Sequence, residues 1–161
     1  MKRVALFAAA AFAGLPAHAD RLPIPADAPP AFAAECGGCH IAFPPSLLTA
    51  DDWRRVMASL DKHYGDNAAL DDRTQRAIGN FLERSAGSGR RTEGANAGNG
   101  ALPRLTIANW FRRKHDEVPT AAWKDKRIGS AANCAACHTR AEMGSYGERE
   151  LRMPGGYRNE H

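Results

Sequence analysis

The sequence contains two pentapeptides of the same form, Cys36-Gly-Gly-Cys39-His40 and Cys134-Ala-Ala-Cys137-His138. Together they use all four cysteines of the chain. One C-x-x-C-H match can arise by chance, whereas two matches that account for every cysteine form a specific signal. The interpretation of the whole chain follows from these ten residues.

The C-x-x-C-H spacing is typical of c-type haem attachment. Two thiols add to the two vinyl groups of one porphyrin, and the adjacent histidine places an imidazole nitrogen on the iron from the proximal side. We therefore expect two covalently bound c-type haems. The predicted attachment sites and proximal ligands are Cys36, Cys39 and His40 for one haem, and Cys134, Cys137 and His138 for the other.

Three other uses of the cysteines fit the sequence less well. A single zinc ion bound by both pairs leaves the histidine after each pair unexplained, and the halves of such a site usually lie closer in sequence. A thioredoxin-like dithiol requires a βαβ pattern, which surrounds neither pair. Structural disulfides are plausible for an exported protein in general. Each of these alternatives explains less of the pattern than haem attachment does.

The N-terminus has the form of a secretory signal peptide. Lys2 and Arg3 precede an apolar run over 4–15, and Ala17-His18-Ala19 supplies small residues at the usual cleavage spacing. The run is too short to cross a bilayer, and no later segment is as apolar. We expect a signal peptide over 1–19, a mature chain over 20–161 without a membrane span, and a periplasmic location.

Composition fits one ordinary globular domain. The chain has 161 residues, of which 43% are hydrophobic and 25% charged. Its net charge is +4, and removal of the predicted signal peptide takes away two of the 22 basic residues that face 18 acidic ones. The longest basic block is Arg112-Arg113-Lys114. This distribution gives little support for nucleic-acid binding, so we expect no nucleic-acid partner.

Outside the two motifs the sequence favours helices and loops and has no convincing alternating strand. A short helix follows Pro29-Pro30 and leads into the first motif, and Pro44-Pro45 ends that region because proline cannot continue a helix. Thr49 caps a second helix with Asp51 and Asp52 in its first turn. The apolar face of this helix is predicted from residues at helical spacing, with His63 on its flank: Trp53, Val56, Met57, Leu60 and Tyr64.

Three further helices are expected. Asp71 or Asp72 caps a third helix that ends near Ser85, a fourth runs over 107–118 until Pro119 stops it, and Ser130 caps a last one that carries the second motif. Their predicted inward residues are Ala77, Ile78, Phe81 and Leu82 on the third, and Ile107, Trp110, Phe111 and His115 on the fourth. The fold class predicted is mostly α, a small helical c-type cytochrome domain in which the two haems form part of the core.

A glycine-rich segment separates the two motif-bearing halves. Residues 86–101 include five glycines and few large apolar side chains. Such a composition cannot bury a core, so we expect a flexible loop that joins two halves of one domain spanning 20–161.

The second axial ligand of each iron decides whether the protein carries electrons or binds a substrate. Once His18, His161 and the two motif histidines are set aside, His63 and His115 remain. His63 lies 23 residues after His40, and His115 lies 23 residues before His138. Local pairing is the simplest arrangement, and a crossed pairing stays open. The competing ligands are the methionine thioethers, which also complete c-type haems: Met57, Met143 and Met153.

The arrangement resembles the small dihaem cytochrome c proteins known as DHC over nearly the whole mature chain. The resemblance depends on a set of motifs in both halves: Cys36-x-x-Cys39-His40-x-Ala42-x-Pro44-Pro45, Trp53-x-x-x-Met57-x-x-Leu60-x-x-His63-Tyr64-Gly65, Asn67-Ala68-x-Leu70-Asp71, Trp110-Phe111-x-x-x-His115-x-Glu117-Val118, Asn133-Cys134-x-x-Cys137-His138 and Pro154-Gly155. The glycine-rich segment, the extreme N-terminus and the tail around His161 lie outside it.

The resemblance implies two six-coordinate, low-spin haems in a periplasmic electron-transfer protein. It also implies redox partners such as a high-spin monohaem cytochrome or a membrane-bound b-type cytochrome. If His63 and His115 close both irons, no position remains for a substrate, and we expect a monomeric electron carrier with low-potential haems rather than an enzyme. The alternative is a haem protein with an open or displaceable sixth site for gas binding or peroxidatic chemistry, or one haem with His/Met ligation.

Overall fold

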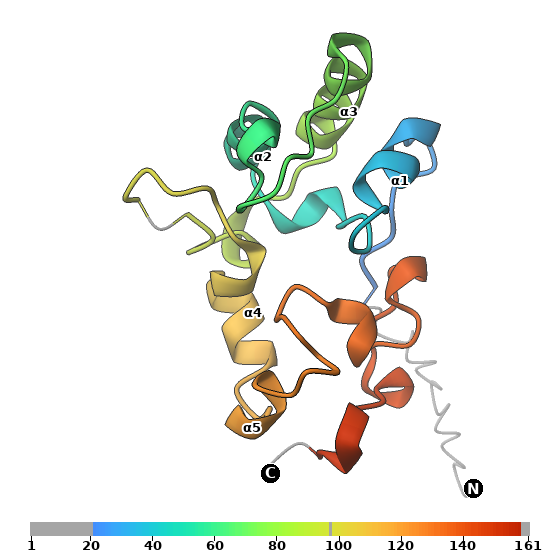
Figure 1. The fold of residues 1–161 in the computed structure, drawn as a ribbon, viewed down its shortest axis with the longest axis vertical. Coiled ribbons are helices and arrows are strands. Elements are labelled where there is room, and N and C mark those ends of the chain that lie inside the picture. The colour runs from blue at the N-terminus through green and yellow to red at the C-terminus, as the bar shows by residue number, and fades with distance from the viewer. Residues whose placement is uncertain (1–20, 97, 159–161) are drawn as a thin grey trace, which may run out of the picture.

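A computed structural model describes residues 21–96 and 98–158, and its regular elements are helices joined by short turns (Figure 1). The α-helices are α1 (Pro30–Cys36), α2 (Ala50–Met57), α3 (Asp72–Arg84), α4 (Asn109–Lys114) and α5 (Thr120–Trp123). Single 3-10 turns lie between and after them: η1 (Pro45–Leu47), η2 (Leu60–Lys62), η3 (Gly89–Arg91), η4 (Leu105–Ile107), η5 (Cys134–Ala136), η6 (Ala141–Met143), η7 (Glu148–Glu150) and η8 (Pro154–Gly156). Within the described ranges the extended pairings are three isolated bridges, Arg21 with Ser145, His63 with Asp66, and His138 with Leu151.

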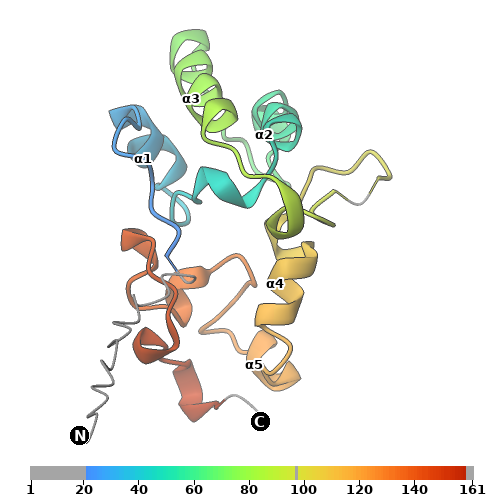
Figure 2. The same cartoon turned by 180° about the vertical axis from the view of Figure 1, so that it is seen from behind.

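The first three helices form one half of the molecule (Figures 1 and 2). α2 and α3 pack against each other through apolar residues at helical spacing. The buried residues are Trp53, Val56 and Met57 on α2, and Ile78, Phe81 and Leu82 on α3. Phe32 of α1 completes the contact, with its ring centroid 4.9 Å from that of Phe81.

Polar side chains begin α2 and α3 as the sequence predicts. The Thr49 hydroxyl accepts a hydrogen bond from the Asp52 amide at 3.1 Å and donates one to the buried Asp52 carboxylate at 2.8 Å. The Asp71 carboxylate accepts from the amides of Arg73 and Thr74. Both caps satisfy N–H groups that have no partner inside the helix.

The predicted extent of the second helix is wrong. α2 ends at Met57, where the Ala58 amide still bonds to Arg54 but the Ser59 amide bonds to Val56, three residues back. The chain then makes the 3-10 turn η2, so Leu60 and Tyr64 do not extend the helix. Tyr64 has a positive φ of 52°, which ends any helical path. His63 therefore lies in a turn and not on a helix flank.

The other helices also differ from the predictions in detail. On α3, Ala77 is exposed and Gly79 is buried in its place. The predicted helix over 107–118 is divided, because Ala108 is extended (ψ 141°) between η4 and α4, and α4 ends at Lys114. The predicted helix after Ser130 is only the turn η5, whereas α5 was not predicted.

The second half contains α4, α5 and the turns of the C-terminal region (Figure 2). The N-terminal segment joins it, since the Leu22 amide donates to the Gly144 carbonyl at 2.8 Å. Gly144 has a φ of 66°, and a Cβ there would lie 2.5 Å from the Leu22 carbonyl oxygen, so the contact requires glycine. The buried cluster runs through both halves, from Phe32 and Phe81 to Leu105 and Phe111.

The glycine-rich segment enters this core, against the expectation that its composition cannot. Ala95 is fully buried and Thr92 is nearly so. The Gly87 amide donates to the Leu48 carbonyl at 2.9 Å, and the Arg104 amide donates to the Ala95 carbonyl at 2.8 Å. Small residues allow this close backbone approach, since a Cβ at Gly87 would lie 2.0 Å from the Ser46 carbonyl oxygen.

The predicted signal peptide over 1–19 lies outside the described residues. In the ranges that the structure describes, no helix has the length and apolar character that a membrane crossing requires.

Candidate cofactor sites

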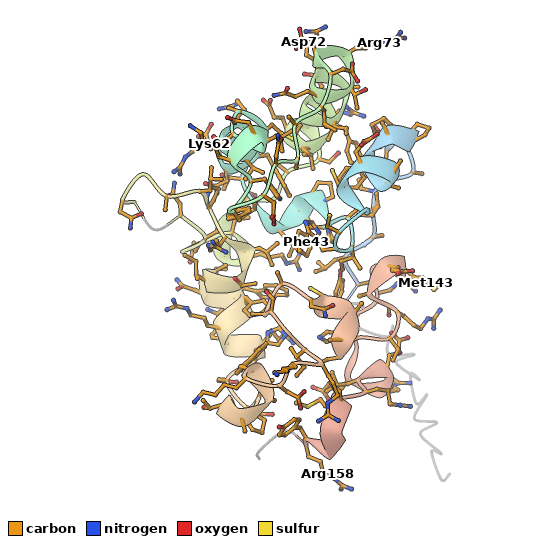
Figure 3. All side chains as sticks on the ribbon, in the orientation of Figure 1. Phe43, Lys62, Asp72, Arg73, Met143 and Arg158 are labelled. Carbon is orange, nitrogen blue, oxygen red and sulfur yellow. The ribbon has the colours of Figure 1, made fainter. Side chains whose placement is uncertain are left out.

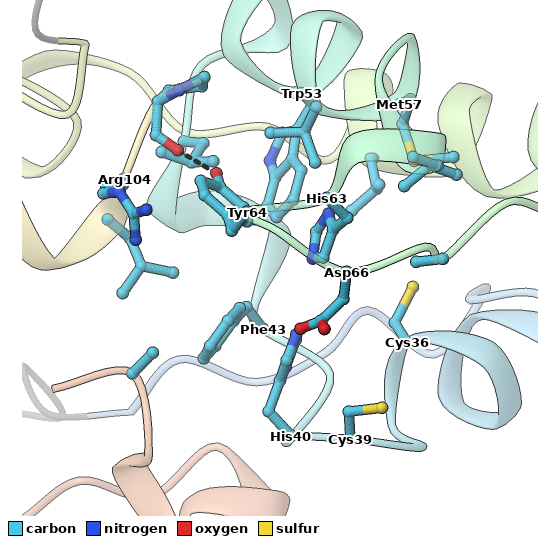
Figure 4. Close-up of a pocket in the computed structure, with 18 of the residues that line it drawn as sticks. Cys36, Cys39, His40, Phe43, Trp53, Met57, His63, Tyr64, Asp66 and Arg104 are labelled. Atoms are coloured by element: carbon cyan, nitrogen blue, oxygen red, sulfur yellow. Dashed lines mark hydrogen bonds between the residues drawn. The ribbon is translucent and has the colours of Figure 1, made fainter. Parts of the chain in front are cut away.

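The first motif faces a large cavity between α1, α2 and the segment around Pro103 (Figure 4). The volume of this first cavity is about 450 Å³. Its walls are mainly apolar and aromatic, with Phe43, Trp53 and Met57 among them. Cys36, Cys39, His40 and His63 all line it.

Backbone geometry presents His40 to the cavity. α1 ends at Cys36, and the Gly37 amide closes the last turn by donating to the Ala33 carbonyl at 3.0 Å. His40 Nδ1 lies 2.7 Å from the Ile41 carbonyl oxygen, and its ring stacks on Phe43 at 4.5 Å. Because a carbonyl only accepts, Nδ1 carries the proton and Nε2 keeps its lone pair for a metal.

His63 approaches from the other side of the same cavity. It follows η2 in a turn that is closed by a hydrogen bond from the Asp66 amide to the His63 carbonyl at 3.0 Å. Tyr64 and Gly65 have positive φ values of 52° and 114°, which turn the chain sharply after His63. His63 Nδ1 is buried and has no hydrogen-bond partner among the described residues.

The second motif faces a separate cavity of about 150 Å³ in the other half. Cys134, Cys137, His138 and His115 line it together with aromatic side chains. His115 follows α4, its Nδ1 lies 2.8 Å from the Phe111 carbonyl oxygen, and its ring stacks on Phe111 at 4.0 Å. As at His40, the carbonyl fixes the tautomer that leaves Nε2 available.

Each cavity therefore holds two facing imidazoles. The ring centroids of His40 and His63 are 6.3 Å apart, with 21° between their planes. Those of His115 and His138 are 6.1 Å apart, with 85° between their planes. The structure thus brings the four predicted histidines together as two local pairs.

Burial favours the neutral forms of two of the thiols and two of the imidazoles that line the cavities. It raises the pKa of the Cys36 and Cys134 thiols to about 11, with a smaller contribution from Glu35 at Cys36. Burial is also the largest cause that lowers the pKa of His63 and of His115, and the charge of His40 adds to the effect at His63. Neutral imidazole is the form that binds a metal.

Comparisons with known proteins agree with this arrangement. The sequence model of the family described as DHC, dihaem cytochrome c, matches residues 32–146. The chain belongs to the dihaem cytochrome c family. No curated protein matches it.

Solved structures of dihaem cytochromes c resemble the chain closely. The diheme cytochrome c from Shewanella baltica OS155 is 35% identical, with a TM-score of 0.68, over 81% of this chain and 97% of the other. A diheme cytochrome c from Rhodobacter sphaeroides is 38% identical, with a TM-score of 0.64, over 73% of this chain and 96% of the other. A structure of DHC purified from the same organism is 36% identical, with a TM-score of 0.61, over 76% of this chain and 99% of the other. These matches confirm the mostly helical cytochrome fold.

As a dihaem cytochrome c, the chain carries two covalently bound c-type haems. The residues present fit this group. A metal–nitrogen bond of about 2 Å, with roughly 1.1 Å from that nitrogen to the ring centre, places two imidazoles on opposite sides of one iron about 6.2 Å apart. The observed separations of 6.3 and 6.1 Å match this value in both cavities.

The structure separates the two cysteine pairs, because each lines a different cavity of this dihaem cytochrome c. They are not arranged around one ion, as the zinc alternative requires. Of the competing methionines, Met57 lines the first cavity and Met153 the second, whereas Met143 is 58% exposed and points outward (Figure 3).

Sequence reasoning missed several residues of the sites. Tyr64 and Arg104 line the first cavity, and Trp123 and Tyr146 line the second, where Tyr146 packs edge-on against His138 at 5.4 Å. Arg104, Trp123 and Tyr146 belong to no spacing pattern that singles them out. The sequence predicts Tyr64 on a helix face, but it lines the cavity from a turn.

Proposed function

We propose that this dihaem cytochrome c is a single-electron carrier with two bis-histidine haems. Cys36 and Cys39 attach one haem, with His40 and His63 as its axial ligands. The second has the same set of residues in the other half: Cys134 and Cys137 for attachment, and His115 and His138 as axial ligands. The two separations between facing imidazoles carry this proposal, because each equals the distance that one iron between them requires.

The side chains around each pair favour histidine over methionine. Met57 is packed among buried residues of α2, and its side chain lies 4.0 Å from where a Cβ of Gly79 would be. Met153 lies in the C-terminal turns. Both line cavities in which two imidazoles already face each other at ligand spacing. We assign both methionines to packing, which suits the flexible thioether against a flat ring.

Haem supplies reversible one-electron chemistry at its iron when bound. The protein residues hold the two imidazoles of each pair in place, keep the Nε2 atoms of His40 and His115 unprotonated, and exclude water with Phe43, Trp53 and Phe111. With both axial positions filled by side chains, no position is left for oxygen or peroxide. Because imidazole replaces thioether as the second ligand, the potentials are low compared with those of His/Met haems.

The predicted signal sequence supports the location, and the dihaem cytochrome c family supports the kind of partner. We propose that the carrier works in the periplasm as a monomer and exchanges electrons with a monohaem cytochrome or a membrane-bound b-type cytochrome. Arg112, Arg113 and Lys114 are exposed on the last turn of α4, just before His115. This basic turn lies beside the second cavity and suits an acidic partner.

The experiment is spectroscopy of the purified holoprotein and of single histidine variants. The visible and electron paramagnetic resonance spectra are expected to show two low-spin, six-coordinate haems, with no rapid carbon monoxide binding by the ferrous protein. His63→Gly and His115→Gly are each expected to open one haem, and His161→Gly is the matched control that leaves both spectra unchanged. Full and fast carbon monoxide binding by the parent protein would instead support the open-site alternative.

A further inference from the structure

The first cavity has a single cationic side chain in its wall. Arg104 is the one Lys or Arg among the described residues that line it. The acidic lining residues are Glu35, next to Cys36, and Asp66, in the turn after His63. The residues that the structure describes contain no carboxylate in an ion pair with Arg104, although other arginines of the chain, such as Arg54 and Arg84, form such pairs.

Arg104 and the two cysteines lie at opposite ends of this cavity. Figure 4 shows Cys36 and Cys39 at one end, Arg104 at the other, and His40 and His63 between them. A c-type haem is attached through the vinyl groups on one edge of the porphyrin, and its two propionates are on the opposite edge. With the vinyl edge fixed by the cysteines, the propionates extend toward Arg104.

Contacts within the protein hold the guanidinium group in position. It lies over the Tyr64 ring, with its central carbon 4.5 Å from the ring centroid. The Tyr64 hydroxyl donates a hydrogen bond to the carbonyl of Pro103, the residue before Arg104. The Arg104 amide donates to the Ala95 carbonyl at 2.8 Å. Tyr64 thus connects the His63 turn to Arg104.

We propose that Arg104 binds a propionate of the haem attached at Cys36 and Cys39 and raises the potential of that haem. The planar guanidinium matches a carboxylate with two parallel hydrogen bonds. A free propionate stabilises the more positive ferric state, and pairing with Arg104 removes part of that stabilisation. Tyr64 is the positioning residue. This inference rests on the proposed attachment of haem in the first cavity.

The test is a potentiometric titration of the holoprotein monitored by visible absorbance. Arg104→Gln is expected to lower the midpoint potential of one haem by about 40 mV. At 59 mV per tenfold change, this is about a fivefold decrease in the equilibrium constant for reduction of that haem. The other haem is expected to shift by less than half as much. Arg104→Lys keeps the positive charge, so its midpoint potential is expected to stay close to that of the parent protein. Arg73→Gln is the matched control, because Arg73 is exposed at the far end of α3 (Figure 3) and its loss removes the same charge away from the cavity.

Two results would overturn the assignment of Arg104. The first is that both midpoint potentials of Arg104→Gln equal those of Arg73→Gln. The second is that Arg104→Gln shifts the midpoint potentials of the two haems by the same amount. The spectra of the same samples separate this failure from that of the proposed function. If the parent protein lacks two six-coordinate low-spin haems, the proposed ligation fails as well. If that spectrum is intact and the midpoint does not move, only the Arg104 proposal fails.

Discussion

The two histidine pairs differ in the angle between their imidazole planes, and this difference has a spectroscopic consequence. The angle is 21° for His40 and His63 and 85° for His115 and His138. Nearly parallel planes split the two iron d orbitals that interact with the ligands, whereas nearly perpendicular planes leave them close in energy. We predict two ferric signals of equal intensity in low-temperature electron paramagnetic resonance, one rhombic and one with a much larger maximum g value.

Single substitutions assign these signals to the two sites. His63→Gly is expected to remove the rhombic signal and leave the other, and His115→Gly is expected to do the reverse. Two signals of the same type in the parent protein would contradict the prediction, because they would require equal angles in both pairs.

At the level of single residues, the sequence names the four histidines but not their orientation. His63 and His115 follow by elimination, since the remaining histidines are few. The pairing of the histidines and the tautomers of His40 and His115 depend on contacts that no spacing encodes, such as those of Nδ1 with the carbonyls of Ile41 and Phe111. The role of Arg104 depends in the same way on a tertiary contact with Tyr64.

At the level of helices, the sequence predicts where a helix begins better than where it ends. The caps Thr49 and Asp71 act locally, so their side chains identify the first turn. The predicted second helix is too long because Leu60 and Tyr64 continue the apolar spacing of α2. Both residues line the first cavity. A segment that faces a flat cofactor therefore shows the same pattern as a helix that faces a core, and the sequence alone does not separate the two.

The Thr49 cap supports the helix that forms one wall of the first cavity. Thr49→Ala removes the acceptor for the Asp52 amide and the donor for the buried Asp52 carboxylate. We predict a loss of about 1 kcal/mol in the free energy of unfolding, measured by denaturant titration of the holoprotein with far-UV circular dichroism. Thr49→Ser keeps the hydroxyl and is expected to retain most of that stability. An equal loss in both variants would show that the methyl group, and not the cap, is responsible.

For the molecule as a whole, the haems complete the core that the short helices begin. The buried or half-buried side chains of Leu48, Trp53, Val56 and Leu60 face the first cavity, and Phe111 and Ile128 face the second. Without a bound group these apolar walls contact water, which removes much of the hydrophobic stabilisation. Among the described helices, only α3 exceeds eight residues, so isolated helices contribute little.

We therefore predict that the apoprotein is largely unfolded. Apoprotein made without haem attachment is expected to show a far-UV circular dichroism signal well below that of the holoprotein, and no cooperative thermal transition. The holoprotein prepared in the same buffer is the control. Full native helicity in the apoprotein would contradict the view that the haems form part of the core.

The distribution of charge over the molecule determines where electrons enter or leave most readily. The exposed basic turn Arg112–Lys114 lies beside the second cavity, whereas Arg73 and Arg76 lie on α3 in the other half. We predict that Arg112→Glu/Arg113→Glu slows oxidation of the reduced protein by ferricyanide, an anionic acceptor, about tenfold at low salt in stopped-flow measurements. Arg73→Glu/Arg76→Glu makes the same change in net charge and is expected to have a much smaller effect. At 1 M salt the screening length falls to about 3 Å, so the variants should converge. Equal slowing by both double variants would mean that net charge, and not the basic turn beside the second haem, controls the rate.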